Sequence, residues 1–234
     1  MQPSMENFLT LAMVKKYKIN RKGMSMGRLR IDPNEFRILI QYSKVFVKIR
    51  LAVFTVLFIY IVRRSKKKEE KLKNNMVQLE VLDRYNRTQL INLDRKDIPL
   101  EYVADVEHTI SLADYGAKFG LGGKCFAIKY GGKYVGIILI GEAVKNEADP
   151  VEVQGEKYFR ILGFLIDNKY QGMGIGTIAL NKAISAVRRE YGKIPLLLEC
   201  HKDNEKAIRF YEQNGFKNTG KLNEKGTDWL MVKK

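Results

Sequence analysis

The chain has 234 residues, and its formal net charge is +16. Residues 1–75 hold 18 Lys and Arg against 5 Asp and Glu, so residues 76–234 carry a balance of only +3. The high isoelectric point is therefore a property of the N-terminal third, and it does not indicate specific nucleic-acid binding. Two cysteines, Cys125 and Cys200, exclude a disulfide framework and have no metal-ligand spacing. We expect both thiols to be buried in a reducing compartment.

The N-terminal third contains a charge-free run of twelve residues, 51–62. As a helix this run would span about 18 Å, which is short of the roughly 30 Å hydrocarbon core of a membrane. Extending it back to Val45 gives eighteen residues but includes Lys48 and Arg50, which could snorkel from near one end. The basic cluster 63–68 that follows favours the cytoplasmic, anionic-lipid side of a membrane.

Three interpretations of this N-terminal extension remain open. Residues 45–68 could tether a cytoplasmic protein to the cytoplasmic face of a membrane, or they could form a buried or surface-docked helix. Alternatively, residues 1–75 are not a natural part of the folded protein, and Met76 is the true start. The stretch 66–75 is expected to be a solvated helix or a linker. Residues 76–234 are enough to bury one core and form the predicted second domain.

The expected elements of residues 76–234 mix strands and helices. Gly131–Gly132 lies between two apolar runs and predicts a hairpin. The expected strands are 77–82, 125–130, 134–140, 158–166 and 195–200, with a last hairpin in 219–234 around Lys225–Gly226. The expected helices are two stretches within 92–117, broken near Pro99, then 177–191 and 204–214.

A glycine-rich segment, residues 167–176, joins a predicted strand to a predicted amphipathic helix. A turn without side chains at the start of a helix exposes backbone N–H groups at the positive end of the helix dipole, which is an anion site. The segment lacks the lysine of a P-loop after its last glycine. Its glycines also have the wrong spacing for a dinucleotide fingerprint, and the glycine-rich stretch 120–124 fails the P-loop pattern as well.

Two motifs resemble those of a known family, and this resemblance indicates which phosphate-containing ligand the glycine-rich segment binds. The pattern Gln-x-x-Gly-x-Gly, at residues 171–176, resembles the acetyl-CoA pyrophosphate loop of the GNAT N-acetyltransferase superfamily. Residues 204–216 resemble the second family motif, N-x-x-A-x-x-x-Y-x-x-x-G-F, in the same order and at the same separation. The resemblance implies the α+β GNAT fold, a mixed central sheet flanked by helices, in which two central strands splay apart to admit the cofactor.

The resemblance also implies how acetyl-CoA, the expected co-substrate, is held. Backbone N–H groups of the loop would bind the pyrophosphate, and the Gln171 side chain could donate to the same phosphates. The preceding strand would pair with the pantetheine arm, and a backbone N–H near Leu165 would polarise the thioester carbonyl. Asn204 would contact the cofactor, cap its helix, or both. The predicted cofactor-binding residues are Phe164, Leu165, Ile166, Gln171, Gly172, Met173, Gly174, Ile175, Gly176, Thr177 and Asn204.

The predicted catalytic residues are Tyr211 and Glu199. Tyr211 falls on the motif tyrosine that donates a proton to the departing thiolate in many family members, and its alternative role is a core aromatic. Glu199 lies in an apolar strand ending near the cleft and is the candidate base, although an exposed strand glutamate is the alternative. Glu142 acting through a water chain is a second candidate for the base. The two histidines, His108 and His201, are expected to face solvent.

The segment 102–136 resembles diamine and spermidine/spermine acetyltransferases, which implies a polyamine-type primary amine as acceptor. Those enzymes carry an acidic residue on the strand before the pyrophosphate loop, whereas residues 161–164 contain no carboxylate. The alternatives are an aminoglycoside or protein-amine acetyltransferase, and a non-catalytic acyl-CoA sensor. We expect direct transfer in a ternary complex, a small-molecule amine and a homodimer partner, and no metal or specific nucleic acid.

Overall fold

The computed structural model of the chain describes residues 33–95, 98–142, 144–155 and 157–234. The chain divides into two units, residues 1–63 and 64–234, and each is considered by itself. The first 32 residues of the predicted N-terminal extension lie outside the described residues, and the extension as a domain stays a prediction.

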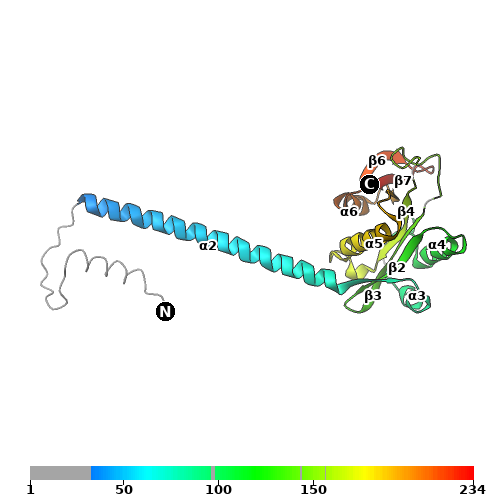
Figure 1. The fold of residues 1–234 in the computed structure, drawn as a ribbon, viewed down its shortest axis with the longest axis horizontal. Helices are drawn as coiled ribbons and strands as arrows, with labels where there is room; N and C mark the ends of the chain where they lie inside the picture. Colours follow the sequence, from blue (N-terminus) through cyan, green and yellow to red (C-terminus); the bar gives the residue numbers. More distant parts are fainter. Residues whose placement is uncertain (1–32, 96–97, 143, 156) are drawn as a thin grey trace. The chain divides into compact units, whose positions relative to one another are not determined.

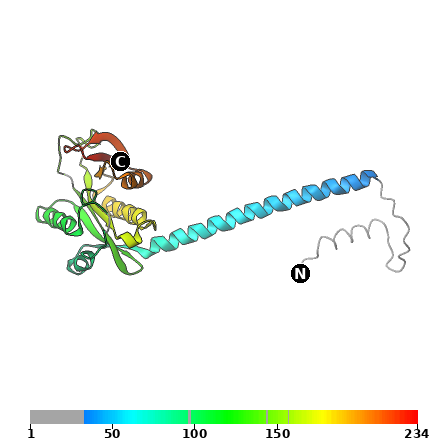
Figure 2. The same cartoon turned by 180° about the vertical axis from the view of Figure 1, so that it is seen from behind.

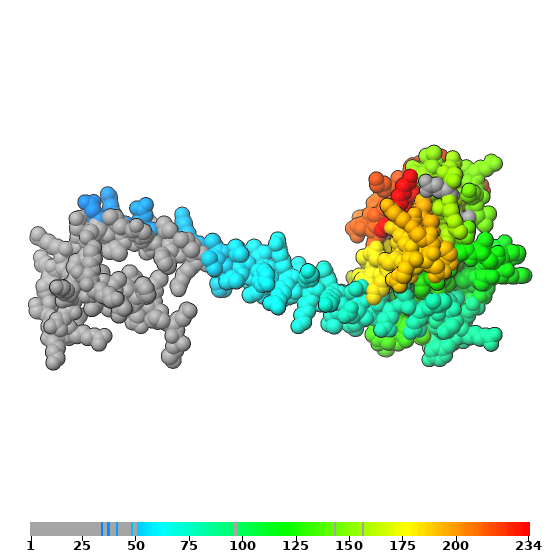
Figure 3. Space-filling model, viewed as in Figure 1, coloured from blue at the N-terminus to red at the C-terminus, as the bar shows by residue number. Residues whose placement is uncertain are grey.

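One long helix, α2 (Pro33–Met76), contains the apolar run (Figure 1). Figure 3 draws the atoms of its stretch after residue 50 in cyan. Every residue from Leu51 to Arg64 is exposed, and the large apolar side chains of 51–62 are between 37% and 72% exposed. The stretch 66–75 is helical and almost wholly exposed, which confirms the predicted solvated helix. Among the residues whose placement is described, no helix has a stretch both long enough and apolar enough to cross a membrane.

A seven-stranded mixed sheet forms the centre of residues 64–234, in the order β1-β2-β3-β4-β5-β7-β6. Its pairs are antiparallel except β4 with β5, which run parallel. The expected α+β arrangement is confirmed, including the edge position of the first strand. The strands are β1 (Val77–Val81), β2 (Gly123–Tyr130), β3 (Lys133–Glu142), β4 (Phe159–Ile166), β5 (Leu196–His201), β6 (Lys217–Leu222) and β7 (Asp228–Lys233).

Helices cover both faces of this sheet (Figures 1 and 2). On one face α5 (Ile175–Tyr191) buries Ala179, Ala183 and Val187, which recur at the helical period expected of a core-facing stripe. On the other face α3 (Arg84–Leu90) and α4 (Val106–Lys118) pack against β2, β3 and β4. A short 3-10 helix, η1 (Asn168–Tyr170), and α6 (Glu205–Gln213) complete the unit.

The first of the two helices expected within 92–117 is misplaced in the prediction. The helix is α3, which begins earlier because Asp83 accepts hydrogen bonds from the backbone of Tyr85 and Asn86, and Asn86 completes a capping box. The second expected helix is confirmed as α4. The connection between them, including Pro99, runs along the cleft described below.

The hairpin around Gly131–Gly132 is confirmed, and both glycines have positive φ, 56° and 84°. A hairpin turn of this kind requires left-handed backbone, which glycine adopts without steric cost. The strand beginning near Tyr158, both C-terminal helices and the last hairpin are also found within one or two residues of their expected positions.

The predicted splay between two central strands is present. Strands β4 and β5 pair only at Phe159 with Leu196 and at Arg160 with Leu197. Beyond Arg160 the two strands diverge, so the β5-facing backbone edge of residues 161–166 has no strand partner among the described residues. This opening is where the cleft lies.

Candidate active site

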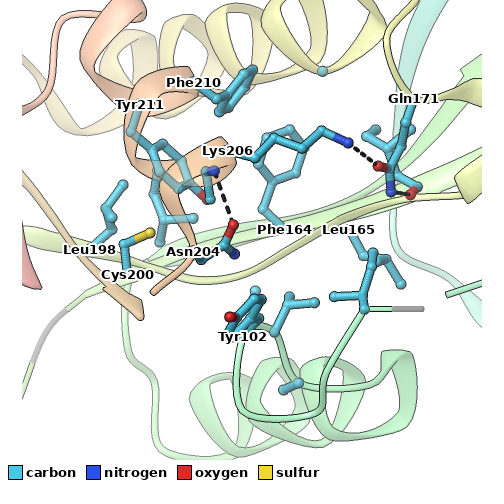
Figure 4. Close-up of a pocket in the computed structure, with 18 of the residues that line it drawn as sticks. Tyr102, Phe164, Leu165, Gln171, Leu198, Cys200, Asn204, Lys206, Phe210 and Tyr211 are labelled. Carbon is cyan, nitrogen blue, oxygen red and sulfur yellow. Dashed lines mark hydrogen bonds between the residues drawn. The ribbon is translucent and has the colours of Figure 1, made fainter. Parts of the chain in front are cut away.

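A cleft of about 1060 Å³ opens between the splayed strands (Figure 4). Its walls come from β4, the end of β5, the α3–α4 connection, the glycine-rich loop and α6. Most residues expected to bind acetyl-CoA line it: Phe164, Leu165, Ile166, Gln171, Gly172, Gly174, Gly176, Thr177 and Asn204. Both predicted catalytic residues, Tyr211 and Glu199, line it as well.

Helix α5 begins at this cleft without a side-chain cap. Helices α3, α4 and α6 are each capped at the N-terminus by the side chain of Asp83, Asp105 or Asn204. The N-cap position of α5 is Gly174, and no side-chain hydrogen bond caps that end in the described part of the chain. The first N–H groups of a helix need partners, and they lie at the positive end of its dipole. The start of α5 therefore suits an anion.

The glycines of this loop have different structural roles. Gly172 and Gly174 have φ of 72° and 77°, and a Cβ at either position would meet nothing within 4 Å. They supply left-handed backbone beside open space, which lets a ligand approach the chain closely. A Cβ at Gly176 would instead lie at van der Waals distance from the rings of Phe210, at 3.6 Å, and Phe164, at 3.7 Å.

Two residues of the predicted set do not present side chains to the cleft. Ile175 is fully buried in the core, and Met173 is partly exposed outside the lining. Only their backbone N–H groups could serve a ligand, which is the role expected of them from the sequence, and that role stays a prediction.

Gln171 is committed to contacts within the protein. Its amide nitrogen donates to the carbonyl of Ile166 over 3.0 Å, and its amide oxygen accepts from the ammonium of Lys206 at 3.1 Å. Figure 4 shows the Lys206 side chain reaching across to Gln171 at one end of the cleft. The loop is thereby tied both to the end of β4 and to the first turn of α6.

The capping role expected of Asn204 is confirmed. Its side-chain oxygen accepts from the backbone N–H of Ala207 at 3.1 Å and so begins α6. The side chain also lines the cleft, so a contact with the cofactor stays a prediction beside the cap.

Tyr211 is half-buried among aromatic rings on α6. Its ring lies 5.2 Å from that of Phe210 and 5.6 Å from that of Phe216, measured between centroids. Burial raises the pKa of Tyr211 above its ordinary value, so the phenol keeps its proton at neutral pH. Its hydroxyl is therefore available as a proton donor.

Cys200 lines the same end of the cleft (Figure 4). Burial raises its pKa to about 11, so its sulfur is a protonated thiol at neutral pH. A thiol in that state is a poor nucleophile, and Cys200 is unsuited to carry a covalent intermediate. Both cysteines are buried and unbridged, as expected from the sequence.

Glu199 belongs to an acidic cluster, defined here as Glu199, Asp203 and Asp228, all of which line the cleft. One Glu199 oxygen accepts from the Arg160 guanidinium at 2.7 Å. The Asn223 amide bridges the other Glu199 oxygen, at 3.0 Å, and Asp228, at 2.7 Å. Arg160 also pairs with the buried Asp149, so a single guanidinium is shared by two carboxylates.

A pair of aromatic rings, tilted by 32° to one another, adjoins this cluster. Tyr102, on the α3–α4 connection, lies 4.9 Å from the ring of His201 at the end of β5. His201 Nδ1 accepts from the backbone N–H of Asp203 at 3.3 Å. The expectation that His201 faces solvent is wrong, because only 13% of its side chain is exposed.

The other candidate base, Glu142, does not reach this cleft. It lines a smaller cavity of about 440 Å³. Hydrogen bonds from Lys157 and from the Gly122 backbone lower its pKa, so it is held in the anionic form. Its carboxylate is thus separated from Tyr211 and the loop.

Within residues 161–164 of β4, which contain no carboxylate, Gly163 has no room for any side chain. A Cβ there would lie 2.5 Å from the Thr109 hydroxyl oxygen of α4, which is closer than real Cβ atoms come to other atoms. Helix α4 therefore packs directly on β4 at Gly163, within the stretch 161–164 where an acid was expected from the resemblance. A carboxylate at residue 163 would not fit unless α4 moved.

Sequence reasoning missed several residues of the cleft. Tyr102, Arg160 and Asp228 come from three segments far apart in the chain, and no local pattern marks them. Lys206 carried one signal: a lysine in the first turn of a helix opposes the preference of the helix dipole for anions there. That mismatch between a residue and its local rule is typical of functional positions.

Comparison with known proteins identifies the origin of this arrangement. Residues 88–216 match the family model described as the acetyltransferase (GNAT) family, which is more than half of the chain. Among solved structures, the chain is similar to AAC(6')-Ib in complex with ribostamycin and coenzyme A. That match has 20% identity, covers 67% of this chain and 92% of the other, and has a TM-score of 0.54.

Two further solved structures are similar at lower scores. One is a spermidine N-acetyltransferase SpeG chimera from Vibrio cholerae and hSSAT, with 17% identity, 67% and 94% coverage and a TM-score of 0.49. The other is Arabidopsis thaliana Naa50 in complex with a bisubstrate analogue, with 22% identity, 68% and 99% coverage and a TM-score of 0.47. At such identities the likeness concerns the fold, and the acceptors named for these proteins differ from one to the next.

Proposed function

The chain belongs to the GNAT acetyltransferase family and is an acetyl-CoA-dependent N-acetyltransferase, and we propose that its acceptor is a small cationic primary amine, a polyamine or a diamine. The observation that carries this proposal is the acidic cluster at the end of the cleft away from the glycine-rich loop. Glu199 and Asp228 line the cleft with Arg160, and Glu101 is next to Tyr102 in the lining. Asp203 lines the cleft just before Asn204, the N-cap of α6.

The charges of the cleft favour opposite ligands at its two ends. The loop end offers the uncapped start of α5 and the ammonium of Lys206, which suit the diphosphate of acetyl-CoA. The rest of the lining offers four carboxylates, of Glu101, Glu199, Asp203 and Asp228, against the Arg160 guanidinium, which already serves the buried Asp149. Glu205 and Arg209, which also line the cleft, pair with each other. A cationic acceptor compensates this negative charge, whereas a neutral or anionic acceptor would leave it uncompensated.

The edge of β4 gives the acetyl-CoA arm a place to bind. Because the β5-facing edge of residues 161–166 has no strand partner, its amides and carbonyls can pair with the amides of a pantetheine chain as an added strand. This pairing would bring the thioester toward Tyr211 and would let a backbone N–H near Leu165 polarise its carbonyl.

Direct transfer follows from the states of the nearby groups. The acceptor, as a neutral amine, attacks the thioester carbonyl and forms the N–C bond, the C–S bond breaks, and the departing sulfur takes a proton from Tyr211. The acetylated nitrogen gives up one proton, which passes through water and restores the Tyr211 phenol. Cys200, as a protonated thiol, is unsuited to an acetyl-cysteine route. Glu199 attracts the ammonium form of the acceptor, and its role as the base that removes the ammonium proton is tested below.

The proposal is tested by CoA thiol release from the full chain with a panel of amines at equal concentration. The panel contains putrescine, spermidine, an aminoglycoside and a lysine peptide. We expect the highest kcat/KM with putrescine or spermidine. A higher kcat/KM with the aminoglycoside or the peptide would contradict the polyamine proposal and indicate an aminoglycoside or protein-amine acetyltransferase. CoA binding without thiol release for any amine would indicate a binding module.

A separate observation favours contact with a membrane. Residues 51–62 are apolar and exposed on every side of α2, and Arg63, Arg64 and residues 66–68 follow directly. We propose that this run inserts into the surface of an anionic bilayer, with the basic cluster at the headgroups.

A homodimer also remains a prediction, which light scattering can test.

Vesicle co-sedimentation of the full chain tests the membrane proposal. We expect binding to vesicles with anionic lipid that exceeds binding to neutral vesicles and falls with salt. Replacing Phe54 and Phe58 with Asp should abolish the binding. The control Tyr115→Asp, which changes an exposed aromatic residue outside this run, should not. Equal sedimentation of the double variant and the wild type would overturn the proposal.

A further inference from the structure

Lys206 occupies an unusual position at the loop end of the cleft. It lies in the first turn of α6, its side chain is exposed, and its ammonium contacts the neutral amide oxygen of Gln171 at 3.1 Å. A cation near the N-terminus of a helix is disfavoured by the helix dipole. The chain thus places positive charge where its own local electrostatics oppose it.

Neighbouring groups leave this charge without an anionic partner on the cleft side. Arg209, one turn further along α6, pairs with Glu205 at 2.5 Å. Lys206 is in no ion pair recorded among the described residues. The uncapped start of α5 adds a second source of positive potential at the same loop. The uncapped start of α5 and the Lys206 ammonium lie at the same loop, and a doubly charged anion is their complement.

We propose that Lys206 binds the diphosphate of acetyl-CoA and that Gln171 is the residue that positions it. This inference rests on acetyl-CoA binding in the cleft. It also changes the role of Gln171, which the sequence suggested as a direct phosphate donor. The Gln171 amide nitrogen donates to the Ile166 carbonyl, which turns the amide oxygen toward Lys206. One of the two Gln171 amide N–H groups is used by the Ile166 carbonyl, and the amide oxygen cannot donate to a phosphate. The Lys206 ammonium offers more, with three donors and a full charge.

Binding of CoA by calorimetry tests this role without any amine acceptor. Relative to the wild-type full chain, Lys206→Gln should bind CoA about tenfold more weakly, which corresponds to about 1.4 kcal/mol. Lys206→Arg, which keeps the charge, should stay much closer to the wild type. The control Lys217→Gln removes an exposed lysine that does not line the cleft, and it should not change CoA affinity. Equal affinity of Lys206→Gln and the wild type would overturn the proposal.

A second ligand separates the diphosphate from the 3′-phosphate of CoA. With 3′-dephospho-CoA, which retains the diphosphate, Lys206→Gln should show the same tenfold loss. Disappearance of the loss with this ligand would assign Lys206 to the 3′-phosphate and would overturn the diphosphate contact. The affinity of the wild type should also fall more steeply with salt than that of Lys206→Gln.

The positioning role of Gln171 is tested by a double-mutant cycle. Gln171→Ala should weaken CoA binding less than Lys206→Gln does, and the double variant should bind no more weakly than Lys206→Gln alone. Additive losses would mean that Gln171 acts on the ligand independently of Lys206.

The unfolding midpoints of all variants, measured in parallel, distinguish a lost contact with CoA from a loss of folding. If no amine of the panel were acetylated, these binding results would still test Lys206, because CoA is the only ligand in the calorimetry. A wild-type protein that did not bind CoA would overturn both this proposal and the proposed function.

Discussion

The two ends of the cleft are built in different ways. The loop end is made by residues 171–177 with the first turn of α6, two short segments that each match a compact motif. The acidic end takes Tyr102 from a connection, Arg160 from β4, Glu199 from β5 and Asp228 from β7. The cofactor end is therefore encoded locally, because it uses backbone amides and a helix terminus. The acceptor end depends on which strands become neighbours, so it can vary while the fold stays the same.

The largest effect on turnover is expected from a substitution of Tyr211, between the two ends of the cleft. Tyr211→Phe removes the proposed proton donor, and we expect kcat to fall about 100-fold or more, since a positioned acid contributes about 10²–10⁴. The KM for acetyl-CoA should change little, because the ring and its packing against Phe210 and Phe216 remain. Steady-state thiol release measures both quantities.

Cys200→Ala is the control for that variant, because a protonated thiol takes no part in the proposed transfer. We expect its kcat to remain within about twofold of the wild type. Unchanged turnover in Tyr211→Phe with CoA still bound would remove the proton-donor role. A large loss in Cys200→Ala would instead revive a covalent route.

At the loop end, Gly174→Ala should lower CoA affinity about 30-fold. The φ of 77° strains any residue with a Cβ, at a cost of about 1–2 kcal/mol, and the new methyl group would point into the open space proposed for the diphosphate. Gly226→Ala is a matched control, because Gly226 has φ of 71° and equally open surroundings in the last hairpin, outside the cleft lining. Both variants should lose similar stability. An equal loss of CoA affinity in both would show that strain alone explains the effect.

Between the ends, Gly163→Ala should destabilise the fold by about 1–3 kcal/mol, because its Cβ overlaps the Thr109 side chain. Adding Thr109→Ala removes the hydroxyl and methyl groups that the new Cβ would meet. The double variant should therefore be less destabilised than the sum of the two single variants. Urea unfolding of all four proteins measures this coupling, and simple additivity would contradict the steric overlap at Gly163.

At the acidic end, Glu199→Gln should raise the KM for the amine about tenfold, consistent with the loss of one partly solvated charge contact of about 1.4 kcal/mol. We expect kcat at saturating amine to change by less than about threefold. A fall in kcat of about 100-fold would instead identify Glu199 as the base. Glu212→Gln, which removes an exposed carboxylate of α6 outside the cleft lining, should leave both constants unchanged.

The smallest expected effect is on the pH dependence of kcat at alkaline pH. The proton donor must be protonated to act, and burial raises the pKa of Tyr211, so its active form persists above the ordinary phenol pKa of about 10. We therefore expect kcat at saturating amine to show no loss from this group between about pH 8 and about pH 10. An alkaline decline in that interval that is present in the wild type and absent from Tyr211→Phe would contradict the raised pKa.

Much of this protein could be predicted from residue patterns that act over short distances. The hairpin at Gly131–Gly132, the helix after Gly174 and the cap at Asn204 all follow from local backbone preferences and hydrogen bonding. The two motifs also located the cofactor end and Tyr211. The misplaced first helix shows the limit of such patterns, since the capping box of Asp83 and Asn86 begins a helix ahead of the predicted range 92–117.

Only the tertiary structure decided which residues meet at the acceptor end and what states they adopt. The partnership of Glu199 with Arg160 and Asn223, and the contact between the rings of His201 and Tyr102, join segments that lie tens of residues apart. The turn of Gln171 toward Lys206 likewise depends on how far β4 and β5 separate. Side-chain contacts across a splayed sheet depend on strand order and divergence, which no local period or propensity specifies.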